Sequence, residues 1–449
     1  MRYTPHTVAD KERMLREIGY RSIDDLTRHV PQSLRDRAGI ALPAGLTELE
    51  VRRRMTILAS RNVSAADGSF FLGAGIYNHF IPSAVDAAIS RAEFSTSYTP
   101  YQPEVSQGTL QALFEYQTLI CQLTGMEVSN AAVYDGASAA AEAVLMSRRI
   151  QPAKKRRVLM SRALHPQYRA VVATYLKNLE DVHLEELPFD GVSGATDPDQ
   201  LRRLLNEQTL CVLLGYPNFF GVIEDPTAIR AACDNVGAQL ITVTSEPLSL
   251  ALLRPPGEYG ADIAVGEGQS LGVPMSLGGP AFGFFACQKK FVRNIPGRLV
   301  GETVDSEGRR GFVLTLATRE QHIRREKATS NICTSQTLCA LAATVYMALL
   351  GKSGLRRVAE INVARAHEAK ARLLQQPGLR ATFSGPFFNE FVLQADNLPQ
   401  LFARCAAQKI IPGVALERYY PQLKNSFLMC VTEMNEREEI DRLVRTSAG

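Results

Sequence analysis

The feature that most constrains the fold of this chain is an alternation of short apolar segments with helix-like segments between about residues 70 and 330. Strand-like runs fall at residues 158–160, 210–214, 239–242, 262–265 and 281–286, and helix-like runs at 138–149, 167–176, 198–205 and 226–236. Short apolar strands separated by helices predict a mainly parallel sheet covered on both faces. Ligands of such folds bind at the carboxyl ends of the strands, so the residues that follow each strand are the candidates for a site.

The regions on either side of this alternation predict two further parts. Residues 1–65 are expected to form a helical arm, in which Thr47 and Glu50 fit a capping box ahead of an apolar stripe. Residues 66–335 are the predicted large α/β domain. Residues 336–449 begin with helix-like segments at 336–350 and 358–374. They continue as a small α+β domain, with strands expected at 391–393 and 426–431 and a helix at 398–408.

The composition argues against several classes of function. The 449 residues are 45% hydrophobic and 21% charged, as in ordinary globular proteins, and a formal net charge of +4 gives no case for nucleic-acid or membrane binding. None of the eight cysteines lies in a C-x-x-C pair, which predicts reduced, packed thiols and no zinc site or other metal site. We expect no signal peptide and no run of about 20 apolar residues, and therefore a cytoplasmic protein.

Three candidate ligand contacts lie near the ends of strand-like segments. Asp135 can cap a helix that begins with small residues and Ser138, and such a turn can offer backbone N–H groups to a phosphate. The alternative is an ordinary capped, alanine-rich helix. His165 can stack on a flat aromatic ligand, although a lone histidine is more often structural. Glu246 follows the strand that begins at residue 239, and taken alone it is a polar residue at a strand end.

Two longer segments are rich in polar side chains. Residues 98–108 read YTPYQPEVSQG, and the prolines fix the backbone so that polar groups point in defined directions. Loops of this kind are typically functional, and the alternative is a proline-rich connector to a helix. Residues 322–334 carry a basic cluster followed by Thr, Ser and Asn, which can bind phosphate or carboxylate. The alternative is a solvated charged turn.

Taken together, these segments resemble the glycine decarboxylase family, the P-protein of the glycine cleavage system. The resemblance extends over nearly the whole chain and matches the alpha-type subunit (subunit 1) of the two-chain form. Several long motifs in the family's order carry it: YTPYQPEVSQG at 98–108, DGASAAAEA at 135–143, RPPGEYG at 254–260, GVPM at 272–275, GGP at 278–280 and TREQHIRREKATSNICT at 318–334.

The resemblance implies a fold and a reaction. The fold is the α/β architecture of pyridoxal-phosphate-dependent transferases of fold type I, a mainly parallel large-domain sheet followed by a small C-terminal α+β domain. The reaction is that of glycine dehydrogenase (aminomethyl-transferring). Glycine loses its carboxylate with pyridoxal phosphate as electron sink, and the aminomethyl group passes to the lipoyl arm of H-protein.

The resemblance also gives Gln269 its meaning. At the matching strand and turn, the enzymes of this fold present a lysine whose deprotonated amine holds pyridoxal phosphate as an imine. A glutamine amide cannot form that bond, which implies that the partner beta subunit binds the cofactor. Ser138, His165 and Glu246 stand where contacts to the phosphate, the ring and the pyridine nitrogen would fall. With Gln269 they are interpreted as remnants of an ancestral cofactor pocket.

Fold-type-I enzymes build each active site at a dimer interface, so this chain is expected to complete the site of its partner. The resemblance implies that Tyr98 and Tyr101 line the glycine pocket of the beta subunit. The residues expected to orient polar groups or to approach the same interface are Gln102, Glu104, Gln107, Asn331 and Thr334.

Three hypotheses follow. The first is a required subunit of glycine decarboxylase that has no covalent cofactor, assembled with the beta subunit as αβ or α2β2 and working with lipoylated H-protein. The second is a scaffold that only stabilises the beta subunit. The third is an independent pyridoxal enzyme using Lys289 or Lys290, which lie too far along the chain for the expected turn.

Overall fold

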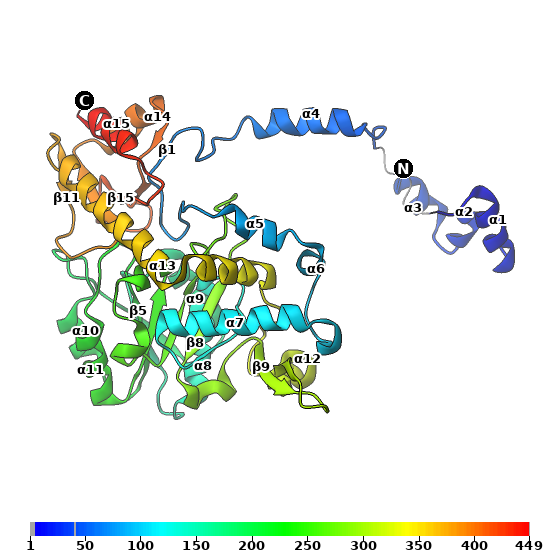
Figure 1. The fold of residues 1–449 in the computed structure, drawn as a ribbon, viewed down its shortest axis with the longest axis horizontal. Coiled ribbons are helices and arrows are strands. Elements are labelled where there is room, and N and C mark those ends of the chain that lie inside the picture. The colour runs from blue at the N-terminus through cyan, green and yellow to red at the C-terminus, as the bar shows by residue number, and fades with distance from the viewer. Residues whose placement is uncertain (1–4, 40–41, 449) are drawn as a thin grey trace. The chain divides into compact units, whose positions relative to one another are not determined.

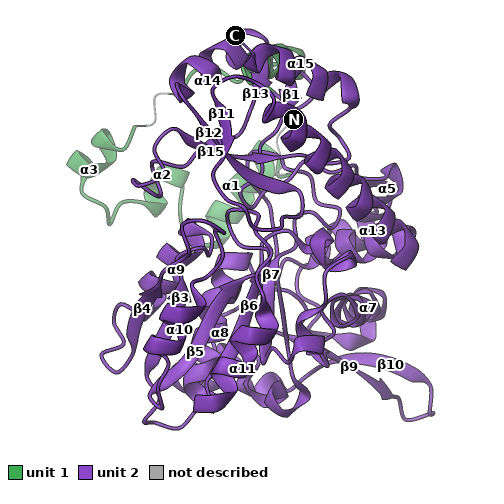
Figure 2. Cartoon of the chain, turned by 90° about the vertical axis from the view of Figure 1, so that its left-hand side faces the viewer, with its two compact units in different colours: residues 1–63 green, residues 64–449 purple. Residues whose placement is uncertain are grey.

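The computed structural model describes residues 5–39 and 42–448, which belong to two compact units spanning residues 1–63 and 64–449 (Figure 2). The first unit is helical. Its helices are α1 (Val8–Glu17), α2 (Ile23–Leu26), α3 (Gln32–Arg37) and α4 (Glu48–Ala59). The predicted capping box is confirmed, because the Thr47 side chain accepts from the Glu50 backbone and the Glu50 carboxylate accepts from the Thr47 N–H. The apolar side chains of α4 are exposed, among them Val51, Met55 and Leu58.

A seven-stranded sheet forms the centre of the second unit (Figure 1). Its spatial order is β2 (Val128–Ser129), β8 (Gly283–Cys287), β7 (Ile263–Glu267), β6 (Gln239–Thr244), β5 (Thr209–Gly215), β3 (Arg157–Ser161) and β4 (His183–Leu187). Strands β7, β6, β5, β3 and β4 are mutually parallel, whereas β8 is antiparallel to β7 and to β2. The predicted mainly parallel sheet is therefore confirmed.

Both faces of this sheet are buried, because alternate side chains of each strand point into different hydrophobic cores. In β5, Cys211 and Leu213 face one core, and Val212 and Leu214 face another. The helices around the sheet are α7 (Gln107–Thr124), α8 (Gly136–Ile150), α9 (Pro166–Leu176), α10 (Pro198–Leu204) and α11 (Pro226–Val236). Residues of α8 and α9 contribute to the first core, and residues of α10 and α11 to the second. This is the layered arrangement that an alternating strand and helix pattern requires.

A long helix, α13 (Thr337–Leu373), leads from the large sheet to the C-terminal part of the chain (Figure 1). It joins the two predicted helical segments, with a kink at Gly351, whose φ of +59° is unfavourable for other residues. Within the described residues, α13 is the one helix long and apolar enough to cross a membrane by length and composition. Its first half packs with α7 residues in a core of the large domain, which is the environment of a buried core helix.

The C-terminal part contains a four-stranded antiparallel sheet of spatial order β11 (Leu379–Ala381), β12 (Glu390–Ala395), β15 (Ser426–Cys430) and β14 (Val414–Ala415). Helices α14 (Leu398–Ala407) and α15 (Arg437–Ser447) pack on this sheet around its own core. An early segment of the chain joins it, since β1 (Ser69–Phe70) pairs in parallel with β13 (Ile410–Ile411). The chain that follows β1 therefore begins beside the small sheet and continues to the edge of the large sheet.

Candidate functional site

The structure brings the four predicted pocket residues to the carboxyl edge of the large sheet. Glu246 follows β6, Gln269 follows β7 and His165 follows β3, while Ser138 lies in the first turn of α8. All four side chains are buried. The segment of residues 73–79, which we call the inner segment, reaches this edge from β1 and hydrogen-bonds directly to Gln269, Glu246 and His165.

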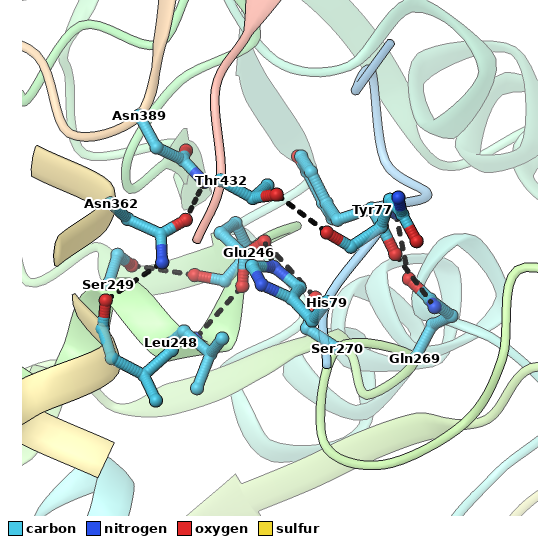
Figure 3. A network of polar contacts seen from close by, with 12 residues as sticks. Tyr77, His79, Glu246, Leu248, Ser249, Gln269, Ser270, Asn362, Asn389 and Thr432 are labelled. Carbon is cyan, nitrogen blue, oxygen red and sulfur yellow. Dashed lines mark hydrogen bonds and ion pairs between the residues drawn. The ribbon is translucent and has the colours of Figure 1, made fainter. Parts of the chain in front are cut away.

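Glu246 is paired with a histidine of the inner segment (Figure 3). His79 Nε2 lies 2.9 Å from Glu246 Oε2, and His79 Nδ1 lies 2.8 Å from Glu433 Oε2. Burial alone would lower the pKa of His79, but the two carboxylates outweigh burial and raise that pKa to about 10. Both ring nitrogens therefore donate, and His79 is an imidazolium held between two carboxylates.

His165 is engaged by the inner segment as well. Its Nε2 lies 2.8 Å from the carbonyl oxygen of Ala74, and its Nδ1 accepts from the Gln167 N–H at 3.2 Å. The ring packs against Tyr168 and Phe219, with centroid separations of 4.7 and 4.8 Å. Burial lowers the pKa of His165 to about 4, so the imidazole is neutral and donates through Nε2. Its predicted stacking face is thus covered by side chains of the protein.

Gln269 holds the backbone of the inner segment at Tyr77 (Figure 3). Its Oε1 accepts from the Tyr77 N–H at 2.9 Å, and its Nε2 donates to the Tyr77 carbonyl at 3.1 Å and to the Val273 carbonyl at 2.7 Å. The Tyr77 hydroxyl donates to Glu390 at 2.9 Å. The amide thus uses both its acceptor and its donors, which a lysine amine at this position would not do.

The first turn of α8, the predicted phosphate cradle, is satisfied by carboxylates of the chain. Asp135 caps the helix, since its side chain accepts from the Ser138 N–H at 2.7 Å. Glu267 Oε2 accepts from the Gly136 N–H at 3.0 Å, and Glu267 Oε1 accepts from Gly268 and Phe282. Burial raises the pKa of Glu267 to about 7. The position that favours an anion at a helix N-terminus is therefore taken by Glu267.

The space at this edge of the sheet is a cavity of about 10 Å³, lined among others by Tyr77, His165, Ser245, Glu246 and Glu390. Such a cavity has room for about one water molecule. The inner segment reaches this depth because Ala74 and Gly75 have φ values of +60° and +100°. A β-carbon at Gly75 would lie 3.1 Å from His165 Nε2, so glycine permits the close approach. The residues at this edge therefore do not fit pyridoxal phosphate.

Lys289 and Lys290 lie at the other edge of the sheet. They follow β8, which is antiparallel to β7, so the end of β8 lies where the parallel strands begin. Lys290 accordingly lines a surface hollow with Gln239 and Asp262, at the starts of β6 and β7. Neither lysine can take the place of Gln269.

The loop of residues 98–108 is largely exposed, with Tyr98 74% and Tyr101 53% accessible. Gln102 and Glu104 are exposed as well. Gln107 is used inside the chain, since its side chain bonds both the N–H and the carbonyl of Phe312, at 2.8 and 2.9 Å, in β10 (Arg310–Thr315). It anchors the loop to that strand.

The second predicted interface segment lies close to this loop. Asn331 is exposed, Thr334 is half-buried, and Cys333 between them is linked to the loop through Arg298. Arg298 donates to the Tyr101 hydroxyl at 2.8 Å and also to the Cys333 carbonyl. The structure thus groups Tyr101 with residues around Cys333 although they are more than 200 residues apart in sequence.

Several residues of the site lie outside the sequence-based predictions. Tyr77 and His79 lie in an irregular segment without strand or helix periodicity, which gives no pattern from which to predict them. Their signal was the run Gly73-Ala74-Gly75 ahead of polar side chains in a mostly apolar stretch. Glu267 stands two residues before Gln269, and a buried carboxylate that close to a candidate site is a signal in its own right. Residues from distant elements hold the inner segment in place. Glu390 accepts from the Tyr77 hydroxyl, Glu433 accepts from His79, and Asn362 donates to Glu433.

Solved structures of distant proteins show the class of this fold. Proteins that are 10 to 17% identical align with TM-scores of 0.62 to 0.65. One of them is C-DES with glycine covalently linked to its PLP cofactor, at 14% identity and a TM-score of 0.62 over 86% of this chain and 97% of that one. The chain has the fold of pyridoxal-phosphate-dependent enzymes of fold type I, as predicted.

Full-length similarity then identifies the family. A model of the glycine cleavage system P-protein matches residues 1–446. A probable glycine dehydrogenase (decarboxylating) subunit 1 of Desulfitobacterium hafniense is 47% identical over 99% of this chain and 98% of its own length. The crystal structure of an inhibitor-bound glycine decarboxylase (P-protein) is 45% identical, with a TM-score of 0.91, over 100% of this chain and 99% of that one. The chain belongs to the glycine cleavage system P-protein family.

Proposed function

We propose that this chain is the subunit of a heteromeric glycine decarboxylase that does not carry the cofactor. The complex decarboxylates glycine and transfers the aminomethyl group to the lipoyl arm of H-protein. Full-length similarity to subunit 1 proteins supports membership of the complex. The observation that supports assigning the cofactor to the other subunit is the filled pocket. In this chain, Gln269 and the inner segment occupy the positions of a lysine and a cofactor.

Pyridoxal phosphate belongs to the beta subunit in this proposal, where it serves as the electron sink for decarboxylation. In this chain, the groups that would contact the cofactor already have partners. Glu246 binds His79, the first turn of α8 binds Glu267, and His165 donates to Ala74. Admitting a cofactor would require the inner segment to leave, which would break these contacts and expose buried carboxylates.

The contribution of this chain to catalysis lies on its surface. Tyr98 and Tyr101 are exposed aromatic side chains on a loop anchored to the body at Gln107. An exposed but anchored tyrosine suits this role, because its ring can exclude water from a partner's site and its hydroxyl can hydrogen-bond and orient the substrate. We place Tyr98 and Tyr101 on the glycine pocket of the beta subunit, in a cytoplasmic αβ or α2β2 assembly. Gln102, Glu104, Asn331 and Thr334 lie on the same two segments and are placed at its rim.

A mixing experiment tests the proposal. The purified chain, incubated with pyridoxal phosphate, is expected to show no visible absorbance from an imine, and adding the beta subunit is expected to give glycine–bicarbonate exchange. In the assembled complex, Tyr98→Phe and Tyr101→Phe are expected to lower exchange about tenfold, the cost of about one well-placed hydrogen bond. Tyr175→Phe, at a partly exposed tyrosine on α9, is the matched control and is expected to leave the rate unchanged.

The two alternatives give different results in the same experiment. If the chain only stabilises its partner, both tyrosine variants will leave exchange at the control rate while assembly persists. If the chain binds cofactor by itself, the visible band will appear before the beta subunit is added.

A further inference from the structure

Arg298 is a buried cation between the two interface segments. It directly precedes β9 (Leu299–Val304), and only 5% of its surface is exposed. One terminal nitrogen donates to the Tyr101 hydroxyl at 2.8 Å, and the guanidinium carbon lies 5.2 Å from the centroid of the Tyr101 ring. The carboxylate of Glu320, 3.7 Å from Nε, supplies the opposite charge. The guanidinium therefore holds both the ring and the hydroxyl of Tyr101.

The same guanidinium fixes the segment around Cys333. It donates to the carbonyl of Cys333, while the N–H of that residue donates to the Tyr134 hydroxyl at 2.9 Å. Tyr134 directly precedes Asp135, the cap of α8. The backbone carbonyl and N–H of Cys333 are thus both hydrogen-bonded to side chains of the large domain, the carbonyl to Arg298 and the N–H to Tyr134.

The hydrogen-bond chemistry of arginine sets the direction of the Tyr101 hydroxyl. A guanidinium has donors and no acceptor, so the phenolic oxygen must accept and its own hydrogen points away from Arg298. Tyr101 is about half exposed, so this O–H is available to a group outside the chain. A carboxylate such as that of glycine is a suitable acceptor.

We infer that Arg298 is a positioning residue for the shared active site, holding Tyr101 and the Cys333 segment in one geometry and directing the Tyr101 O–H toward the partner's substrate carboxylate. The inference rests on the proposed role of Tyr101. Arginine suits this task and lysine does not, because one planar guanidinium can donate hydrogen bonds to two acceptors and also contact the face of an aromatic ring. A displacement of about 1 Å in such a group costs up to about 100-fold in rate.

The test is a double-mutant cycle in the assembled complex with the beta subunit. Arg298→Met, Tyr101→Phe and the double variant are compared by kcat and KM for glycine in the exchange assay, with assembly checked by size-exclusion chromatography. Tyr101→Phe is expected to lower kcat/KM about tenfold and Arg298→Met about 10- to 100-fold, and the double variant is expected to lose no more than the worse single one. Arg310→Met, an exposed arginine over Phe312 in the neighbouring strand, is the matched control and is expected to keep wild-type activity.

The outcomes separate this inference from the proposed function. Loss of activity in Tyr101→Phe with wild-type activity in Arg298→Met overturns the inference alone, and so do losses that multiply in the double variant. Wild-type activity in Tyr101→Phe contradicts the proposed role of the loop. If Arg298→Met does not assemble, Arg298→Lys takes its place in the cycle. Wild-type kcat/KM in an assembled Arg298→Lys complex then overturns the inference.

Discussion

The amide of Gln269 makes three hydrogen bonds that depend on its having both an acceptor and donors. A lysine amine has donors and, when charged, no acceptor. Replacing Gln269 by lysine would therefore leave the buried N–H of Tyr77 without a partner and would introduce an ammonium next to the inner segment. An unpaired buried donor costs about 1–3 kcal/mol.

We accordingly expect Gln269→Lys to lower the free energy of unfolding by about 2 kcal/mol without creating a cofactor site. The variant alone, mixed with pyridoxal phosphate, should give no visible imine band and no decarboxylation of glycine. Gln208→Lys, at an exposed glutamine, is the matched control for stability. A borohydride-reducible band or measurable decarboxylation by Gln269→Lys alone would show that the pocket is still usable.

His79 gives the pocket a dependence on pH. Its pKa is raised from the ordinary 6.5 to about 10 in the folded chain by Glu246 and Glu433, against the effect of burial. A raised pKa means that the histidine stabilises the fold fully below about pH 6.5 and that this stabilisation is lost as the pH rises through about 10. Removing one partner of a buried ion pair typically costs about 3 kcal/mol or more.

His79→Gln is therefore expected to lower the free energy of unfolding by about 3 kcal/mol near pH 6, with the gap to the wild type closing between pH 7 and 10. Denaturant titrations across this range measure the gap. His183→Gln, at an exposed histidine, should show no such gap. A gap of constant size over the whole range would argue that His79 is not charged in the fold.

At the scale of elements, the inner segment depends on a turn with positive φ angles at Ala74 and Gly75, a backbone conformation that few residue types adopt. Gly75 has a φ of +100°, and a β-carbon there would meet His165 at 3.1 Å. We expect Gly75→Ala to cost about 2 kcal/mol, from a strained backbone and a tight contact. The change is measurable as a lower denaturant midpoint. Gly191→Ala is the control, because its β-carbon would enter open space and its φ is not positive. Equal midpoints for the two variants would mean that the inner segment adapts freely.

The strands β3, β5, β6, β7 and β8 and the helices α8 to α11 of the large domain could be predicted from the sequence because each buries a regular pattern of apolar side chains. The strands β2, β4, β9 and β10 fall outside the sequence-based predictions. The edge strand β4 lacks an apolar pattern because it carries His183, Glu185 and Glu186, and it pairs with β3, where Arg157 forms an ion pair with Glu185. Glu246 and Gln269 could be located because they follow regular strands. Tyr77 and His79 could not, because their burial is decided by contacts 167 to 354 residues away in sequence.

At the scale of the whole molecule, two features of the chain oppose each other. The fold of a cofactor-dependent enzyme is complete, from the seven-stranded sheet to the capped first turn of α8. The place at which such a fold binds its ligand is closed by the chain's own carboxylates, imidazolium and amide. Under the proposed function, this chain contributes only surface residues to catalysis, and its activity depends on a partner subunit that holds the cofactor.

This opposition predicts the stoichiometry of the complex. A dimer of two competent fold-type-I subunits holds two cofactors, whereas a pair of this chain with the beta subunit should release about one pyridoxal phosphate per αβ pair on alkaline denaturation. Titrating this chain into a fixed amount of beta subunit should raise glycine–bicarbonate exchange until the chains are equimolar and no further. The beta subunit alone, loaded with cofactor, is the control for release. Two cofactors per pair would place one of them in this chain and would require the inner segment to leave its pocket on assembly.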